Sequence, residues 1–530
     1  MISIISFVGF TALVAIISYF ATRNVNETTG EGYFLGGRSL GAVVIAGSLL
    51  LTNLSTEQIV GLNGQAFSEG LLVMAWETLA AIAIVLTALF LLPRYLTGGL
   101  TTVPQFLERR FDKTTKTIVS ALFLSGYMII LLPIVLYSGA IAISTMFELP
   151  ELLGISYTAS IWLCVWGIGI LGSIYAIFGG LKAVAVSDTV NAVGLLIGGL
   201  MIPVFGLLAV GDGSIFGGIE VLVESNPEKF DSIGGSDASV PFATIFTGMM
   251  LVQLFYWGTN QAIIQRALAA RNLKEGQKGL MLAALIKVLA PMMVVLPGII
   301  AFHLFQGNLE NADQAYPALV NAVLPAPLVG FFAAVLVGAI LSSFNSALNS
   351  SVTLFGVDIY KEYIDKDASD EKVVRKGKNF GIVLAIFSMF IAPFIANAPS
   401  GLFGYLQEVN GCYSIPILTI IVMGYFHKRV SAFAAKLAIL SGVFLYIVYL
   451  ILKYFILSPE DMPHYLHVMA MIFVFNMLLM LVISMVKPRE TAYVEEYTGQ
   501  VEVTPWKYVK PVGISICVLV IAIYVYFAQY

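Results

Sequence analysis

Long apolar runs separated by short polar segments extend along the whole chain, and their length predicts membrane-spanning helices. An α-helix needs about 20 mainly apolar residues to cross a bilayer. Windows of this length predict about fourteen spans, an even number that places both termini on one side. The first span has no Lys or Arg before it and no small-residue cleavage site after it, so we interpret it as a retained helix. The predicted spans are 3–21, 40–68, 70–97, 117–147, 156–178, 184–210, 241–269, 276–306, 326–360, 379–396, 399–425, 431–456, 465–486 and 511–529.

Polar residues interrupt the second span near its centre. The run from Ser48 to Gly64 is apolar on both sides of the segment TNLSTEQ, residues 52–58. An unpaired amide or carboxylate near the middle of a bilayer is costly unless it faces protein or water. We therefore expect a broken helix whose polar groups face a ligand.

The composition assigns the chain to integral membrane proteins. Its 530 residues are 58% hydrophobic and 11% charged, with a mean hydropathy of +0.90, whereas soluble chains carry roughly 25% charge. The net charge of −4 gives no reason to expect nucleic acid. The three cysteines and four histidines lack the spacing of a disulfide framework or a metal site. The polar loops are too small for a catalytic domain and show no nucleophile–base pair, so we do not expect an enzyme.

Basic residues give an independent test of the span count. All Lys and Arg residues except Lys229, Lys453 and Lys287 fall on alternate loops, and this count includes Arg94, Arg266, Lys278 and Lys436, near the ends of their spans, as loop residues. By the positive-inside rule these loops are cytoplasmic and both termini lie outside. We expect a multi-pass protein of the plasma membrane, with a bacterial inner membrane as its location.

Several polar side chains fall at membrane depth. Structural ion pairs or snorkelling side chains are one explanation. Lys287 fits it poorly, because it stands more than a turn from either end of its span and requires a carboxylate partner. We therefore favour a polar cavity. The residues concerned are Glu57, Gln58, Glu77, Asp188, Lys287, Gln407 and Glu408.

The ninth span carries a stripe of small polar residues that places Ser342 and Ser346 on one helical face. Such stripes often only pack helices closely. Alternatively, the adjacent hydroxyls of Ser342 and Ser343 and the carbonyl of Ala339 supply oxygen ligands to a cation. Carbonyls of the broken span, at Leu51 and Leu54, then complete the shell. A neutral oxygen cage suits Na⁺ better than a transition metal.

These features belong to segments that together resemble the solute:sodium symporter family, most closely its sodium/glucose (galactose) cotransporter branch. The similarity runs in order and at family spacing from about residue 5 to the last inner loop. The segments are YFLGGRSLG (33–41), SLLLTNLSTEQ, WE (76–77), FYWGTNQAIIQRALAA (255–270), QKGLMLAALIKVLAPMMVVLPGI (277–299), AILSSFNSALNSSVTLFGVDIYKEY (339–363) and YLQEVNG (405–411).

The resemblance implies an all-α LeuT-type core of two inverted five-helix repeats, with one helix before it and three after it. Each repeat begins with a broken helix, and a second polar interruption at 256–261 agrees with that expectation. The implied divisions are an N-terminal helix and inner loop at 1–39, the first repeat at 40–210, an outer loop at 211–240, the second repeat at 241–425 and peripheral helices at 426–530.

The resemblance also implies a role for particular residues. Carboxylate, amide and ammonium groups are the partners that sugar hydroxyls require, and aromatic side chains close the pocket on both sides. Carried over position by position, the sugar contacts are Gln58, Glu77, Gln253, Lys287 and Gln407; the gates are Leu62, Trp76 and Phe403 outside with Tyr256 and Trp257 inside; the Na⁺ ligands are Leu51, Leu54, Ala339, Ser342 and Ser343; and the ion-release carboxylate is Asp188.

Because the chain departs from the galactose transporter at three positions, we expect a monosaccharide but not galactose in particular. Gln253 replaces Asn, Ala80 replaces Ser and Leu132 replaces a polar amide. Two alternatives stay open. One is another small polar solute, such as a polyol, sialic acid or an amino acid. The other is a substrate-gated sensor or cation channel without turnover. No protein partner is expected beyond the lipid bilayer.

Overall fold

The computed structural model describes residues 34–309, 312–397, 402–458 and 461–529, with scattered positions between 6 and 20. Among these residues, ten helices are long and apolar enough to cross a membrane, and three bent pairs raise the number of spans to 13. The remaining predicted span, 3–21, lies only partly within the described residues. The all-α prediction is confirmed.

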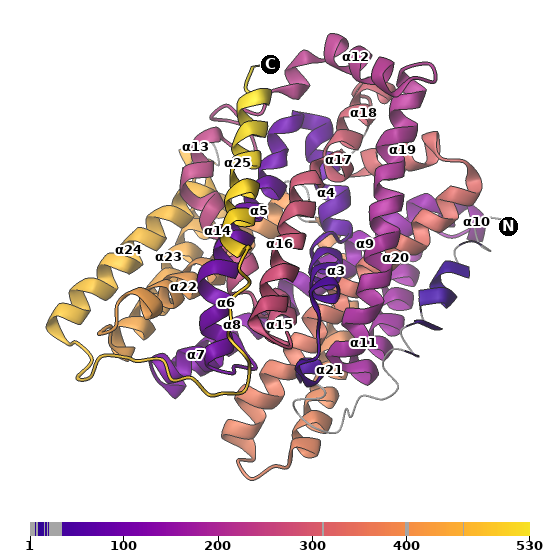
Figure 1. Cartoon of the computed structure of the whole chain (residues 1–530). Helices are drawn as coiled ribbons and strands as arrows, with labels where there is room; N and C mark the ends of the chain where they lie inside the picture. Colours follow the sequence, from indigo (N-terminus) through magenta and orange to yellow (C-terminus); the bar gives the residue numbers. More distant parts are fainter. Residues whose placement is uncertain are drawn as a thin grey trace.

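The first half of the chain runs from the first bent pair to a long segment that packs against the second half (Figure 1). Its helices are α3 (Ala42–Asn53), α4 (Thr56–Glu69), α5 (Ala75–Leu86), α6 (Leu92–Thr97), α7 (Val103–Arg110), α8 (Lys113–Gly126), α9 (Leu132–Met146), α10 (Leu149–Leu153), α11 (Tyr157–Val210) and α12 (Ile215–Ser225).

The second half contains two further bent pairs and ends with peripheral helices. Its helices are α13 (Phe242–Thr244), α14 (Met250–Gly258), α15 (Gln261–Leu268), α16 (Leu273–Leu289), α17 (Pro291–Val294), α18 (Leu296–Phe305), α19 (Ala315–Val323), α20 (Ala326–Thr353), α21 (Asp370–Ile391), α22 (Leu402–Phe426), α23 (Ala432–Ile451), α24 (Tyr465–Val486) and α25 (Val509–Phe527).

The long segment α11 covers the predicted spans 156–178 and 184–210, and the structure gives Tyr157–Ile174 and Val184–Val210 as its candidate membrane spans. Gly172 lies against Phe344 of α20, and Gly198 lies against Phe332 of the same helix. A straight helix would separate the two glycines by about 39 Å, whereas the two phenylalanines are only about 18 Å apart along α20. The chain therefore bends back between the two spans.

The three bends have different local causes. The chain leaves helical geometry at Leu54, and Ser55 is extended before α4 begins at an angle of 57° to α3. Asn260 is extended before α15, giving a bend of 48°. Both breaks were predicted from polar interruptions. The third bend, of 46°, lies between Leu273–Leu289 and Pro291–Phe305. It was not predicted, because 276–306 was expected to form one continuous helix.

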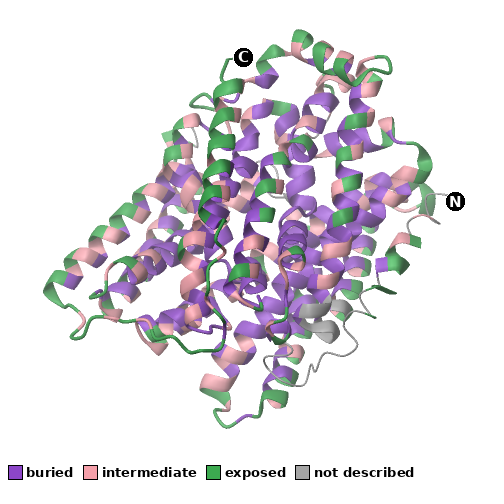
Figure 2. Ribbon diagram, viewed as in Figure 1, coloured by how far each residue is buried: buried purple, intermediate pink, exposed green. Residues whose placement is uncertain are grey.

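Burial separates a central group of helices from a peripheral one (Figure 2). In the most apolar window of the span Ala326–Ile364, 72% of the residues are buried inside the protein, against 22% for Val509–Phe527. The exposed apolar side chains of the peripheral helices face the lipid, where no water opposes their exposure. The core that positions the site is therefore built from α3, α4, α5, α14, α16, α20 and α22.

The polar segments between the spans are also helical in part. A π-helical turn continues to Ile364, and α21 begins at Asp370. In α7 the side chains of Phe106 and Leu107 are buried. Residues 487–508, which we call the strap, connect α24 to α25; in Figure 1 the strap is the yellow trace that passes α7.

Candidate functional site

A small cavity lies where the two broken helices face α5 and α22. Its volume is about 30 Å³, above the roughly 10–15 Å³ that a cavity needs to hold a water molecule. Side chains from both halves of the chain form its wall, so the cavity connects the two repeats. The lining residues are Asn53, Gln58, Trp76, Val252, Gln253, Tyr256, Trp257 and Gln407.

Three of the five predicted sugar contacts, Gln58, Gln253 and Gln407, line this cavity. The side-chain amide of Gln253 donates to the carbonyl oxygen of Trp76 at 2.7 Å. The side-chain amide of Gln58 donates to one carboxylate oxygen of Glu77. The cavity wall is therefore rich in amide groups, each of which offers both a donor and an acceptor.

The other two predicted contacts, Glu77 and Lys287, form an ion pair. Both side chains are fully buried, and the ammonium nitrogen of Lys287 also lies 5.6 Å from the ring centre of Trp257. Removing two charges from water is costly, and the pair repays that cost only with good geometry and further hydrogen bonds. Gln58 supplies one such bond and links the pair to the cavity.

Aromatic side chains close the cavity on two sides. Trp76 and Phe403 meet edge to face at 5.2 Å between ring centres, and Leu62 is fully buried. A Cβ at Gly61 would collide with Phe403, so this glycine permits the close approach of α4 and α22. On the other side, Tyr256 and Trp257 pack edge to face at 5.4 Å. Of the predicted gate residues, Trp76, Tyr256 and Trp257 line the cavity, whereas Leu62 and Phe403 do not.

The end of α3 meets the serines of α20. The hydroxyl of Ser343 donates to the carbonyl oxygen of Thr52 at 2.6 Å. The hydroxyl of Thr52 lies 3.4 Å from that of Ser342 and 3.0 Å from that of Ser346. Leu51 stands next to Thr52 in the last turn of α3, and all these residues are buried.

The remaining predicted ligands belong to the same two elements. Leu54 stands at the break itself, and Ala339 precedes Ser343 by one helical turn. The oxygens that meet here are the carbonyl and hydroxyl of Thr52 and the hydroxyls of three serines of α20, all without a net charge. This donor set fits Na⁺, a hard cation that prefers oxygen, and does not fit a soft metal ion.

Asp188 lies beside this region on α11. One of its carboxylate oxygens accepts a hydrogen bond from the hydroxyl of Ser48 at 2.7 Å. A second cavity, of about 220 Å³, is bordered by Asp188, Asn191, Ser342 and Asn345. Ser342 therefore stands between the break in α3–α4 and a cavity that reaches the predicted ion-release carboxylate.

Arg266 was counted as a loop residue, but the structure places it inside the protein. Its side chain is fully buried and donates to the hydroxyls of Ser48 and Ser346. Arg110 and Lys116, which were also counted as loop residues, are buried as well. A hydropathy window measures the average polarity of a stretch of sequence and does not report how deeply a residue is buried. It therefore misses the burial of a basic residue in the last turn of a helix that ends inside the protein.

Two residues of the cavity wall were not predicted, Asn53 and Val252. The amide nitrogen of Asn53 is 3.4 Å from the side-chain oxygen of Gln58. Asn53 belongs to the polar interruption of the second span, so the signal was present but was assigned only to Gln58. Val252 is one more apolar residue in an apolar helix, and its position carries no signal.

Comparison with known proteins identifies a family. The pattern of the sodium:solute symporter family matches residues 33–442. The chain is 49% identical to an uncharacterized symporter, YidK, of Escherichia coli, over 100% of this chain and 91% of that protein. It is 34% identical to a sodium/glucose cotransporter of Vibrio parahaemolyticus, over 83% and 84% of the two chains. It is 30% identical to human sodium/myo-inositol cotransporter 2, over 85% and 70%.

Solved structures share the fold. A Na⁺-coupled sialic acid symporter in a substrate-bound outward-open state superposes with a TM-score of 0.77 at 20% identity, covering 93% of this chain and 99% of that chain. A nucleobase-cation-symport-1 family transporter in a closed conformation gives 0.57 at 16% identity, covering 85% and 94%. The LeuT-type fold expected from the sequence is confirmed, and these neighbours are transporters.

Proposed function

We propose, from the premise that this chain belongs to the sodium:solute symporter family, that it imports a monosaccharide together with Na⁺. Sodium-coupled transport of a solute follows from membership of the family. The choice of a sugar is supported by one observation above the others. Gln58 joins the cavity wall to the buried pair of Glu77 and Lys287, which presents acceptors and donors in one connected group.

A sugar hydroxyl both donates and accepts hydrogen bonds, so it needs a partner of each kind. In our proposal the substrate contacts Gln58, Gln253 and Gln407, with Glu77 and Lys287 behind them. The hydroxyls take over the hydrogen bonds that Gln58 now makes with Glu77 and that Gln253 makes with the Trp76 carbonyl. A molecule without those hydroxyls leaves buried polar groups unpaired and binds far more weakly.

Sodium in this proposal binds between the end of α3 and α20. The carbonyls of Leu51, Leu54 and Ala339 and the hydroxyls of Ser342 and Ser343 are its ligands. The ion holds the break in the conformation in which Gln58 is ready for the sugar. Asp188 then provides the next oxygen site on the way to the cytoplasm, since Ser342 borders the cavity that contains it.

The electrical gradient is large enough to drive this process with one ion. A single Na⁺ that moves through about 100 mV releases about 2.3 kcal/mol, which supports roughly 50-fold accumulation of a neutral solute. The two gates alternate: Leu62, Trp76 and Phe403 separate to admit the sugar, and Tyr256 with Trp257 move aside to release it. Rocking of one helix bundle against the other produces both openings.

The membrane orientation is part of the proposal. The strap and the segment 361–378 face the cytoplasm, and both termini lie outside, in a bacterial inner membrane. The structure has the C-terminus and α12 at one end and the segment 361–378 at the other (Figure 1). Modification of a cysteine introduced at Lys366 by a membrane-impermeant reagent, in intact cells and in inverted vesicles, measures this directly.

The experiment that tests the function is uptake of labelled sugars into proteoliposomes that contain the purified chain. A panel of hexoses is assayed with an inward Na⁺ gradient and with choline in place of Na⁺. We expect one hexose to accumulate only with Na⁺. Undiminished uptake in choline contradicts the coupling, and absence of uptake for every hexose contradicts the choice of a monosaccharide.

A polyol is the second candidate, because the chain resembles a human sodium/myo-inositol cotransporter and lacks two polar groups of the galactose branch, at Ala80 and Leu132. Including myo-inositol in the same panel distinguishes the two substrates. Exchange of labelled for unlabelled substrate across the membrane also excludes a sensor or channel without turnover, because only a carrier catalyses such counterflow.

A further inference from the structure

A long groove lies between α16 and α25, on the side of the molecule away from the sugar cavity. Its volume is about 580 Å³. Apolar side chains of the two helices form its walls, and the polar or amphipathic ones lie towards the end where the strap joins α25. The lining residues are Lys278, Met281, Leu282, Leu285, Trp506, Tyr508, Pro511, Val512, Ser515, Ile516 and Leu519.

The groove changes in chemistry along its length. Leu282 and Leu285 are 37% and 45% exposed although they belong to a membrane-spanning helix, so they face acyl chains and not water. At the other end stand Trp506 and Tyr508, side chains that favour the level of lipid head groups. The groove therefore extends from the interface into the hydrocarbon region.

Positive charge is concentrated at the polar end. The segments 271–278 and 502–510 carry the basic residues Arg271, Lys274, Lys278, Lys507 and Lys510 against the two acidic residues Glu275 and Glu502. Glu275 is 3.2 Å from both Arg271 and Lys278. One carboxylate shared between two cations leaves these segments with an excess of positive charge. Lys278 itself lines the groove, and the ammonium nitrogen of Lys507 lies 4.6 Å from the ring centre of Tyr508, another lining residue.

We propose that this groove binds an anionic phospholipid, with an acyl chain along the walls and the phosphate group near Lys278 and Lys507. Basic pockets between transmembrane helices on the cytoplasmic side are suited to such head groups. A free phosphate ion makes no favourable contact with the apolar walls. A zwitterionic lipid has no net charge, so it gains little from the excess of positive charge. The phospholipid matches both parts of the groove.

The occupant of this groove contacts the helix that carries Lys287. Lys278 and Lys287 both belong to α16, and the backbone nitrogen of Trp506 donates to the side chain of Gln277 on that helix at 2.8 Å. The same Gln277 donates to the carbonyl of Ala88 at 3.1 Å. A bound lipid thus supports α16 from the side opposite to the sugar cavity.

Native mass spectrometry of the full chain in detergent tests the proposal, with phosphatidylglycerol and phosphatidylcholine of identical acyl chains as probes. Each lysine near the head group contributes about fivefold to the binding of an anionic lipid. We expect phosphatidylglycerol to be preferred, and Lys278→Gln and Lys507→Gln each to reduce that preference about fivefold. Ser515→Trp, which fills the groove, should reduce the binding of both lipids.

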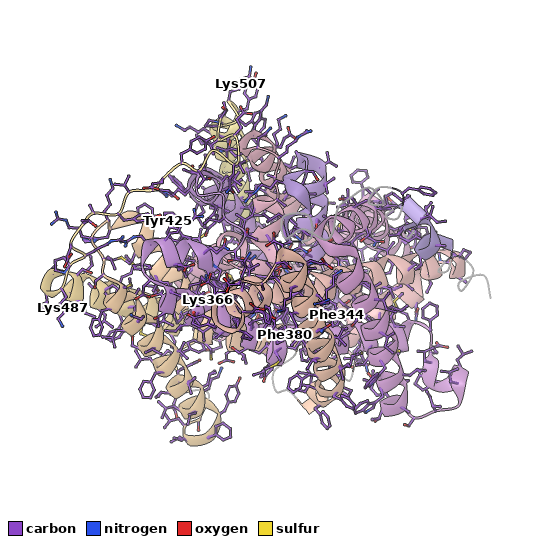
Figure 3. The ribbon with its side chains drawn as sticks, turned by 90° about the horizontal axis from the view of Figure 1, so that it is seen from below. Phe344, Lys366, Phe380, Tyr425, Lys487 and Lys507 are labelled. Atoms are coloured by element: carbon purple, nitrogen blue, oxygen red, sulfur yellow. The ribbon has the colours of Figure 1, made fainter. Side chains whose placement is uncertain are left out.

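The matched control is Lys487→Gln. Lys487 is another basic residue at the same end of the molecule, but it stands at a different edge from Lys507 (Figure 3). Equal preference for phosphatidylglycerol in the wild type and in the Lys278→Gln and Lys507→Gln variants overturns the proposal, as does full competition by inorganic phosphate. Because Lys507 is exposed, its variant stays informative even if Lys278→Gln folds poorly. The measurement uses neither sodium nor sugar, so its result is independent of the proposed substrate.

Discussion

The break between α3 and α4 and the break between α14 and α15 differ in the side chains that hydrogen-bond to them. At the first break, the carbonyl and hydroxyl of Thr52 pair with small hydroxyls, those of Ser343 and Ser346 on α20. At the second, the phenol of Tyr127 donates to the side chain of Asn260 at 2.7 Å and accepts from the backbone nitrogen of Ala262 at 3.0 Å.

Further bonds emphasise the difference. The phenol of Tyr95 donates to the carbonyl of Gly258 at 3.0 Å, next to the second break. Two tyrosine hydroxyls thus hydrogen-bond to the chain at the second break. Because their rings are buried and packed, these hydroxyls cannot easily move away from their partners. Short serine and threonine hydroxyls can turn towards an ion instead. In our proposal, the second break is a fixed joint, whereas the hydroxyls at the first break exchange their hydrogen bonds for contacts with the ion.

The largest effect is expected where both repeats meet, at the pair of Glu77 and Lys287. Glu77→Gln leaves the buried ammonium group without its counter-charge, which typically costs 3–5 kcal/mol, so we expect a loss of thermal stability by about that amount. The double variant Glu77→Gln with Lys287→Gln should recover most of the stability but no sugar uptake. Thermal unfolding and uptake are measured on the same preparations. If Glu77→Gln is as stable as the wild type, the two repeats do not depend on this pair.

The next effect concerns the first break alone. Ser343→Ala removes a hydroxyl from the proposed sodium site, and we expect the apparent Na⁺ affinity of uptake to fall by about 100-fold. Ser351→Ala is the control, since Ser351 is a buried serine of the same helix whose hydroxyl donates to the carbonyl of Ala347. An unchanged Na⁺ dependence in Ser343→Ala would place the ion elsewhere and remove the distinction between the breaks.

A smaller effect of a different kind is expected at the second break. Tyr127→Phe leaves the ring in place but removes one hydrogen bond each from Asn260 and Ala262, which stay bonded to one another at 3.0 Å. The free energy of unfolding should therefore fall by about 1–2 kcal/mol. The Na⁺ dependence of uptake should stay the same. A thermal melt and a sodium titration report the two quantities separately. A shifted Na⁺ affinity would show that the second break also takes part in ion binding.

The smallest effect involves the strap, which crosses the end of the molecule near α7. Burial raises the pKa of Glu495 to about 7, although Arg94 and Arg109 oppose the rise. The docked strap therefore favours the protonated carboxyl: its stability is greatest below the ordinary pKa of glutamate, about 4.5, and declines as the pH rises towards 7.

We accordingly expect the backbone amides of residues 493–502 to exchange faster at pH 7.5 than at pH 5, after correction for the intrinsic rate of exchange. Glu495→Gln should remove this difference. Residues 51–58 do not belong to the strap, so the exchange rate of their backbone amides serves as an internal reference. A pH effect of equal size in the variant would assign the change to another group.

Much of the fold could be predicted from the sequence, because hydropathy determines which segments enter a bilayer. The positions of the first two breaks were also predicted, since polar residues such as Asn53 and Asn260 have no other reason to occur at that depth. The third bend followed a proline within an apolar run, and proline alone does not reveal whether neighbouring helices will compensate for the lost hydrogen bond.

The candidate site was predicted in part. Gln58, Gln253 and Gln407 line the cavity, and Lys287 has the carboxylate partner that its depth required, namely Glu77. That this pair stands behind the cavity wall depends on how separate helices pack, which no local pattern encodes. Arg266 was missed for a related reason: its depth is set by where the break directs α15, and not by its distance from the nearest apolar run.

The ion pair of Glu77 and Lys287 also constrains how the protein is made, since its two members are 210 residues apart in the chain. At a synthesis rate of about 5–20 residues per second, α16 leaves the ribosome about 10–40 s after α5. During that interval an unpaired carboxylate in a newly inserted helix costs about 3 kcal/mol. The amide of Gln58, which is synthesised just before Glu77, is the first partner at hand, so α4 and α5 should associate before the second repeat exists.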